Sequence, residues 1–181
     1  MESEEGNYIM TYTSYDGKIA RLCLASSTDL VNWEKHGLLL GKAKNGKYKD
    51  LWSKSGAIVC KSEGDKLIAS KVSGKYWMYW GDTDIFLATS ENLIDWQPVE
   101  EEDGSIKKIF GPRKGYFDSD LVEPGPPAII TKDGIWMIYN SRNHTEWGDT
   151  LLPEGTYAAG QILFDLQNPE KVIARSEEYF F

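Results

Sequence analysis

Two acidic residues of this chain stand beside turn signals that would hold a carboxylate in place. Glu123 directly precedes Pro124-Gly125-Pro126-Pro127, and proline fixes φ and biases the residue before it towards extended geometry. A carboxylate on so restricted a backbone suits a general base, although Glu123 could instead only hydrogen-bond the backbone ahead of the turn. Asp118 lies in a Phe-Asp-Ser turn, where it either contacts ligand hydroxyl groups or closes an Asx turn.

A second set of polar residues follows apolar, strand-like segments. Carboxylates, amides and guanidinium groups at strand ends can bind the hydroxyl groups of a ligand. Asp82 comes after Trp80-Gly81, and three further candidates follow the segment 135–139: Asn140, Arg142 and Asn143.

The segments that would position these residues repeat along the chain. Each repeat is an apolar segment centred on methionine and preceded by a turn signal. A Ser/Thr-rich corner ending in Trp follows the first two copies, and we expect Trp33 and Trp96 to pack in the core. The methionine-centred copies are Tyr8–Tyr12, Tyr76–Trp80 and Ile135–Tyr139, and the corner copies are Leu22–Trp33, Ile85–Trp96 and, more weakly, Gln161–Val172.

The repeat predicts an all-β fold, a β-propeller of four-stranded antiparallel blades. No sustained helical period is present, and units of roughly 60 residues suit propeller blades. We expect a single domain over 1–181 with blades near 1–60, 61–125 and 126–181. Closed propellers use about four to eight blades, so we expect this one to be incomplete, with further blades, a partner chain or a homo-oligomer covering the open blade edges.

Composition excludes several classes of function. The net charge of −8 argues against nucleic acid, whose binding sites are basic. Cys23 and Cys60 lie in apolar segments and predict buried thiols, and the two histidines show no zinc-ligand spacing, so we expect neither metal nor cofactor. We expect no membrane span and no signal peptide, hence a cytoplasmic location. The 7 Trp and 10 Tyr favour strands and offer flat faces on which sugar rings can stack.

Several phrases together resemble glycoside hydrolase family 130, whose members are five-bladed propellers that act on β-mannosides. The resemblance covers nearly the whole chain in the right order and implies an oligosaccharide substrate, a β-mannoside. The phrases are Tyr8–Gly17, Leu24–Trp33, Phe117–Pro127, Gly134–Asn140 and Leu163–Arg175.

The resemblance is incomplete at the residue that it implies as general acid. Family members carry that Asp in a Glu-Asp-Pro-Arg segment ahead of the strand that here reads Tyr8–Tyr12, and no such segment stands in this sequence. We therefore expect the 181-residue chain alone to be inactive or nearly so.

The resemblance also bears on the choice between hydrolysis and phosphorolysis. Phosphorylase members bind phosphate through a basic residue at the strand end that here carries Trp80 and through a His where this chain has Asn140. They carry a small residue where this chain has Glu123. A carboxylate there would repel phosphate and could activate water, so the pattern favours inverting hydrolysis with Glu123 as the base.

Three hypotheses remain open: a β-mannoside hydrolase, a β-mannoside phosphorylase, and a non-catalytic carbohydrate-binding or truncated, inactive propeller fragment. The resemblance adds Lys54, in Trp52-Ser-Lys54, which matches a lysine near the family's site. The predicted site is thus Glu123 as base, with these substrate contacts: Lys54, Trp80, Asp82, Asp118, Asn140, Arg142 and Asn143.

Overall fold

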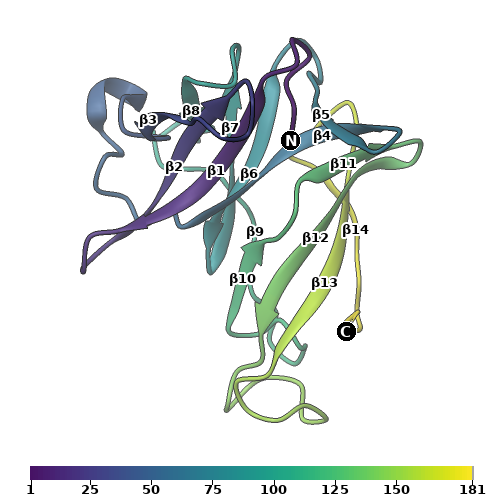
Figure 1. Ribbon diagram of the computed structural model, residues 1–181. Helices are drawn as coiled ribbons and strands as arrows, with labels where there is room; N and C mark the ends of the chain where they lie inside the picture. The colour runs from purple at the N-terminus through teal and green to yellow at the C-terminus, as the bar shows by residue number, and fades with distance from the viewer. Residues whose placement is uncertain (181) are drawn as a thin grey trace.

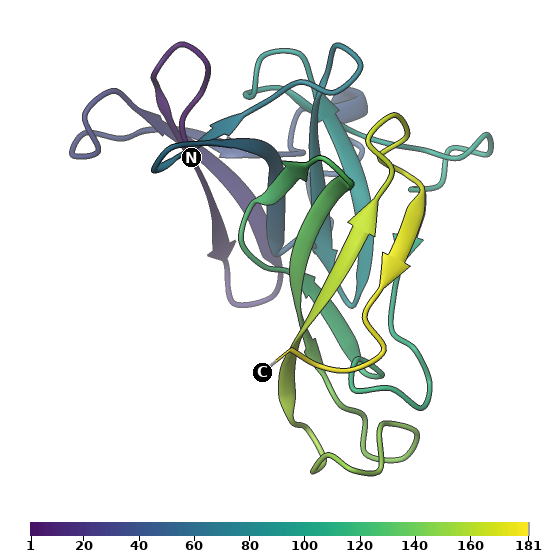
Figure 2. The same ribbon diagram turned by 90° about the vertical axis from the view of Figure 1, so that its right-hand side faces the viewer.

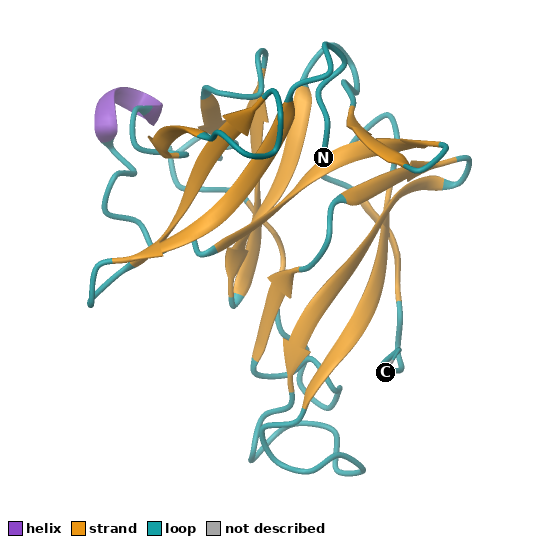
Figure 3. Ribbon diagram, in the orientation of Figure 1, coloured by secondary structure: helices purple, strands orange, loops and turns teal. Residues whose placement is uncertain are grey.

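The structure is a computed structural model that describes residues 1–180, and almost all of its regular elements are strands (Figure 3), which confirms the all-β prediction. None of these residues forms a helix long and apolar enough to cross a membrane. One short 3₁₀ helix, η1 (Ala43–Gly46), accompanies the strands. The strands are β1 (Tyr8–Tyr15), β2 (Ala20–Ser27), β3 (Glu34–Leu38), β4 (Ser55–Glu63), β5 (Lys66–Ala69), β6 (Tyr76–Asp82), β7 (Asp84–Ser90), β8 (Trp96–Pro98), β9 (Lys108–Phe110), β10 (Leu121–Pro124), β11 (Ala128–Thr131), β12 (Gly134–Arg142), β13 (Tyr157–Phe164) and β14 (Val172–Arg175).

The strands form three sets of antiparallel neighbours, consistent with part of a propeller. The first set is β1-β2-β3, the second is β4-β6-β7-β8, and the third runs from β11 through β12 and β13 to β14, with β10 also paired to β12. A short parallel pairing of β4 with β11 joins the second and third sets into one sheet. Figure 1 shows β1 to β3 on one side, β10 to β14 on the other, and β4 and β6 between them, and Figure 2 shows β12, β13 and β14 side by side.

Near the blade boundaries expected at residues 60 and 125, one strand already belongs to the next set along the chain: β4 to the second set and β10 to the third. β4 begins before residue 60 and pairs with β6, and β10 ends before residue 125 and pairs with β12. The whole-chain propeller domain with these blades stays a prediction.

The three methionine-centred segments lie on β1, β6 and β12, in matching positions of the three sets. Met10 is opposite Ala25, Met78 opposite Ala88, and Met137 opposite Ile162. Met78 and Met137 are fully buried, whereas Met10 is 38% exposed. The difference arises because Met78 and Met137 each pack in one of the two core clusters, whereas Met10 belongs to neither.

The corners after β2 and β7 have the same hydrogen bonds. Asp29 Oδ1 accepts the backbone N–H groups of Val31 and Asn32, and Asn92 Oδ1 accepts those of Ile94 and Asp95. Each corner is therefore an Asx turn.

The Trp that ends each corner donates its indole N–H in the same way, but the two differ in burial. Trp33 bonds to Leu30 O and Trp96 to Leu93 O. Trp96 is buried as expected, whereas Trp33 is only half-buried, so the core prediction is wrong for Trp33. Trp96 belongs to the core cluster shared by the first and second sets, which covers it.

The core consists of two apolar clusters, one at each junction between neighbouring sets. The first joins β1 and β2 to β4 and β6, and the second joins β6 and β7 to β12 and β13. Cys23 and Cys60 are buried free thiols, as predicted, and burial raises the pKa of Cys60 to about 12. The second junction matters most here, because polar strand ends of the second and third sets meet there.

Candidate active site

Four of the predicted site residues come together where the second and third sets meet. Lys54 Nζ donates to Glu123 Oε1 and lies 3.8 Å from Asp82 Oδ1. Asn140 Nδ2 donates to the other carboxylate oxygen of Glu123 at 3.2 Å. We call Lys54, Asp82, Glu123 and Asn140 the carboxylate cluster.

Glu123 is positioned by the short strand β10. In the ladder with β12, Glu123 is directly opposite Asn140 and Pro124 is opposite Tyr139. Val122 is fully buried in the core, and because side chains alternate along a strand, Glu123 points to the other face. The side chain of Glu123 is only 12% exposed. Glu123 is therefore a confined carboxylate just before the proline-rich turn.

Asp82 is positioned by a tight hairpin between β6 and β7. Gly81 has φ +143°, and a Cβ there would lie 2.0 Å from the Asp84 carbonyl oxygen, so only glycine fits. The N–H of Thr83, at the tip, donates to Val122 O at 3.1 Å. This bond fastens the hairpin to β10 and so holds Asp82 beside Glu123.

Lys54 reaches the cluster from the segment that follows the first set. Its φ of 39° is uncommon for a residue with a side chain. The Thr13 hydroxyl donates to Lys54 O at 2.8 Å, and Ala20 O accepts the N–H groups of Ser53 and Lys54 at 3.0 and 3.4 Å. The first set thereby fixes the backbone that presents this ammonium group to the two carboxylates.

The pKa values of the two carboxyl groups of the cluster are shifted in opposite directions. Burial alone would raise the pKa of Glu123, but the hydrogen bonds from Lys54 and Asn140 outweigh it and lower that pKa below its ordinary value. Burial raises the pKa of Asp82, helped by the charge of Glu123 and opposed by the Trp52 hydrogen bond and the charge of Lys54. The lowered pKa favours the ionised form of Glu123, the form that a general base requires.

Lys54 is held in its charged form by the same contacts. Burial alone would lower its pKa, but the bond to Glu123 and the charge of Asp82 raise it above its ordinary value. The cluster therefore places one ammonium group beside two carboxyl groups.

Two exposed aromatic residues next to the cluster were not predicted. Trp52 Nε1 donates to Asp82 Oδ2 at 2.5 Å, and the Tyr15 ring meets the Trp52 ring edge-on with centroids 6.5 Å apart. The only sequence signal was the place of Trp52, two residues before Lys54. No sequence pattern predicted that Tyr15 would contact Trp52.

Arg142 lies two residues beyond Asn140 on β12 and does not contact the cluster. Its Nε donates to Asp120 Oδ2 at 2.5 Å, and its guanidinium carbon lies 5.9 Å from the centre of the Tyr157 ring. Its charge is thus already paired with a carboxylate.

Three other predicted contacts are corrected by the structure, beginning with Trp80. Its side chain is fully buried in the first core cluster, 5.0 Å from the Phe86 ring. The residue is therefore part of the core and not of a ligand site.

Asp118 is a fully buried structural anion, so neither of its two predicted roles describes its side chain. Arg113 binds it through Nε at 3.0 Å and Nη2 at 2.8 Å, Arg175 Nη2 donates at 2.6 Å, and the Tyr139 hydroxyl donates at 2.7 Å. These bonds tie the loop before β10 to β12 and β14.

Asn143 is also buried, with 2% of its surface exposed. Its Nδ2 donates to the carbonyl oxygens of Asp149 and Leu152, at 3.0 and 3.2 Å. The side chain organises the loop between β12 and β13 and has no donor directed at a ligand.

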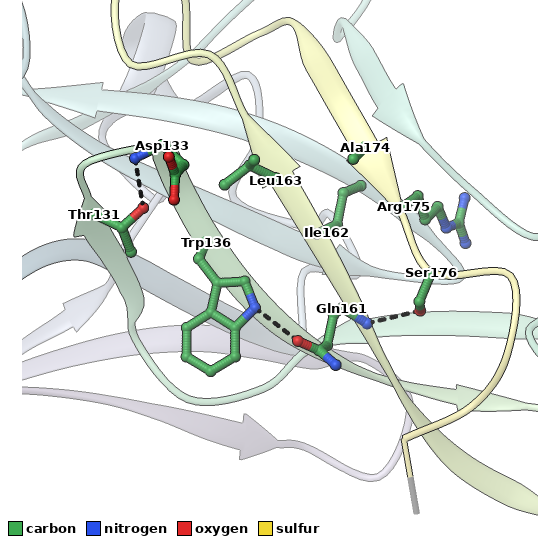
Figure 4. A pocket seen from close by; sticks show the side chains of 9 residues that line it. All are labelled: Thr131, Asp133, Trp136, Gln161, Ile162, Leu163, Ala174, Arg175 and Ser176. Atoms are coloured by element: carbon green, nitrogen blue, oxygen red, sulfur yellow. Dashed lines mark hydrogen bonds between the residues drawn. The ribbon is translucent and has the colours of Figure 1, made fainter.

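A separate pocket of about 510 Å³ lies on the face of β12, β13 and β14 (Figure 4). Trp136 Nε1 donates to Gln161 Oε1 at 3.1 Å within this pocket, and the Arg175 guanidinium is bound by Asp118. Within residues 1–180, no group of three or more His, Cys, Asp and Glu side chains is arranged to hold a metal ion. The carboxylate cluster is therefore the best candidate for chemistry in the described chain.

The three strand sets are consistent with part of a β-propeller and place carboxyl groups at neighbouring strand ends. Residues 2–181 match the model of the glycoside hydrolase 130 family, described as beta-1,4-mannooligosaccharide phosphorylase. The chain belongs to glycoside hydrolase family 130.

Three relatives illustrate the range of the family. The chain is 31% identical to a 1,2-beta-oligomannan phosphorylase of Thermoanaerobacter sp. (strain X514), over 96% of this chain and 49% of that protein. It is 47% identical to the crystal structure of a glycosyl hydrolase from Bacteroides ovatus, with a TM-score of 0.97 over 99% of this chain and 50% of that one. A third solved structure, 46% identical with a TM-score of 0.97 over the same shares, is described with the finding that the GH130 family of mannoside phosphorylases contains glycoside hydrolases that target beta-1,2 mannosidic linkages in Candida mannan. The chain spans about half the length of these proteins.

Proposed function

We propose that the carboxylate cluster belongs to a β-mannoside hydrolase and that Glu123 is the base that activates water. The observation that carries the proposal is the charge of the cluster, in which Lys54 is shared by Glu123 and Asp82. Phosphorolysis needs cations to hold a phosphate dianion, and arginine forks suit it best. Here the nearest cations, Lys54 and Arg142, already face carboxylates.

The chemistry assigned to Glu123 is one half of an inverting displacement. Glu123 removes a proton from water while the water oxygen bonds to the anomeric carbon, and the bond from that carbon to the glycosidic oxygen breaks. The leaving oxygen then needs a proton from an acid about 6.5–9.5 Å away from the base. Asp82 is too close to be that acid, because it shares Lys54 with Glu123. Asp82 therefore has an electrostatic role, and the acid is a carboxyl group outside the cluster.

Phosphorolysis is the second candidate, since the family description and the 31% identical relative are phosphorylases. Carbohydrate binding without turnover is the third. The first candidate is supported by the structure at 47% identity, described as a glycosyl hydrolase, and by the structure at 46% identity, whose description says that the family of mannoside phosphorylases contains glycoside hydrolases.

The test is turnover of 2,4-dinitrophenyl β-mannoside, whose leaving group departs without a proton and therefore needs only the base. We expect mannose to be released at a rate that does not depend on inorganic phosphate. β-1,2- and β-1,4-mannobiose, which do need an acid, are assayed beside it in the same buffers.

The products separate the three candidates. If mannose 1-phosphate forms, and only when phosphate is present, the proposed function changes from hydrolysis to phosphorolysis. Binding of mannobiose with no product from either kind of substrate would leave the non-catalytic candidate. Asp133→Asn, in the turn before β12, serves as the control variant for these assays. Asp118→Asn does not serve, because Asp118 supports the fold.

A further inference from the structure

Tyr15 and Trp52 form an exposed aromatic pair that neither the core nor the proposed chemistry uses. Tyr15 is 64% exposed and Trp52 is 45% exposed, and their rings meet edge-on at 6.5 Å and 68°. Large aromatic side chains gain most when they are covered. Two of them side by side at a polar cluster indicate a surface that a ligand covers.

The Trp52 ring is held in place before any ligand arrives, and the backbone that carries Tyr15 is ordered by a turn. The Trp52 indole is anchored by the bond of 2.5 Å from Nε1 to Asp82 Oδ2. Tyr15 ends β1 ahead of a turn in which Asp16 Oδ1 accepts the N–H groups of Lys18 and Ile19, each at 2.9 Å. Preorganised rings bind a ligand at less entropic cost than mobile ones.

The chemistry around the pair selects the ligand. A flat indole face suits the C–H face of a pyranose ring, and neighbouring carboxylates accept bonds from its hydroxyl groups. The acidic cluster and the net charge of −8 disfavour phosphate-bearing ligands such as nucleotides.

We propose that Trp52 and Tyr15 form a subsite for an additional sugar ring of an oligosaccharide whose cleaved unit lies at Glu123. The proposal rests on the proposed β-mannoside function for its choice of sugar. The link is direct, since Trp52 contacts Asp82 and Asp82 adjoins Lys54 and Glu123. The pair thus sets a preference for longer substrates.

The experiment measures binding of mannose, β-1,2-mannobiose and β-1,2-mannotriose by calorimetry. We expect the wild-type protein to gain roughly 3- to 10-fold in affinity when a ring that reaches the pair is added, the range given by one aromatic contact. Trp52→Ala should lose this gain. The sugar C–H protons should shift upfield in the NMR spectrum of the wild-type complex only, a signature that a purely structural role of Trp52 would not give.

Trp52→Phe separates stacking from the support of Asp82. It keeps an aromatic face and loses the indole N–H, so most of the gain from length should remain. Trp136→Phe is the matched control, because Trp136 also donates its indole N–H to a side-chain oxygen, that of Gln161, on a different face of the protein.

The outcomes distinguish failure of the subsite from failure of the proposed function. Turnover of the activated mannoside with no gain from length, or a gain that survives Trp52→Ala, overturns the subsite alone. A gain in affinity with length that depends on Trp52, without turnover of any substrate, supports the subsite and contradicts the proposed hydrolase function. Absence of binding to every mannoside overturns both.

Discussion

Asn140 stands directly opposite Glu123 in the β10–β12 ladder, and its side-chain amide donates to the Glu123 carboxylate at 3.2 Å. Backbone pairing therefore dictates this side-chain contact. The resemblance implies a histidine at this position in phosphorylases, whereas this chain has a neutral donor that favours the ionised form of the neighbouring carboxylate.

Replacing Asn140 by Asp tests that contact with almost no change in shape. The new carboxylate removes a hydrogen bond and adds a negative charge, so the pKa of Glu123 should rise. The acid limb of kcat/KM for the activated mannoside should then move to higher pH, since that limb reports the free enzyme's base. An unmoved limb would contradict the assignment of Glu123 as that base.

Replacing Glu123 by Gln removes the base and keeps the shape. In an intact propeller that contains this segment, we expect kcat for mannoside hydrolysis to fall by at least about 100-fold, in line with losses of a general base. KM should change little, because the sugar contacts survive. Asn143→Ser, in the buried loop, controls for stability loss, and near-normal kcat in the Gln variant would remove the main support for hydrolysis.

Replacing Asp82 by Asn should change how stability depends on pH. The folded-state pKa of Asp82 is raised above its unfolded value of about 3.9. Its protonation therefore stabilises the fold fully below about pH 4, and this contribution is lost as the pH rises through the folded-state pKa. The Asn variant does not suffer that loss, so its melting temperature relative to wild type should increase between about pH 4 and pH 7.

Asp84→Asn is the matched control for that measurement, because it lies on the other arm of the same hairpin. Asp84 forms an ion pair with Lys108 at 2.6 Å, so its loss should not stabilise the protein at neutral pH. A relative melting temperature of the Asp82 variant that falls towards neutral pH would show that Asp82 is stabilised in its charged form.

Replacing Asp118 by Ala should damage the fold itself. The change leaves the guanidinium groups of Arg113 and Arg175 without their buried anion. Breaking a buried ion pair by removing one partner costs about 3–5 kcal/mol. Urea unfolding should show that the free energy of unfolding falls by this amount. A decrease below about 1 kcal/mol is typical of surface ion pairs and would contradict the structural role of Asp118.

The sequence was most informative where structure is local. The methionine-centred repeats predicted three equivalent strands, β1, β6 and β12, and the Asx corners form around Asp29 and Asn92. Burial was harder to predict, because Trp33 and Trp96 end the same motif and differ only in whether a neighbouring blade covers them.

The candidate site was predictable only in part, because contacts between residues far apart in the sequence depend on how the strand sets pack. Lys54, Asp82, Glu123 and Asn140 were each singled out. The β10–β12 ladder pairs Glu123 with Asn140, and the Lys54 side chain links Glu123 to Asp82. The partners of Asp118 were not foreseen, since Arg175 lies 57 residues away along the chain. Tyr15 and Trp52 were missed because their contact depends on how the first set lies against the second.

The division of the strands into two sheets has a dynamic consequence. β4 and β11 carry a backbone ladder between the second and third sets, whereas β1, β2 and β3 form a sheet of their own. Continuous ladders open as one cooperative unit, and a sheet attached by side chains and loop bonds can open alone. Amide protons of β1 and β2 should therefore exchange with solvent sooner than those of β6 and β12. Because the first sheet also fixes the backbone of Lys54, each such opening would release the ammonium group from Glu123 while the two carboxyl groups stay together.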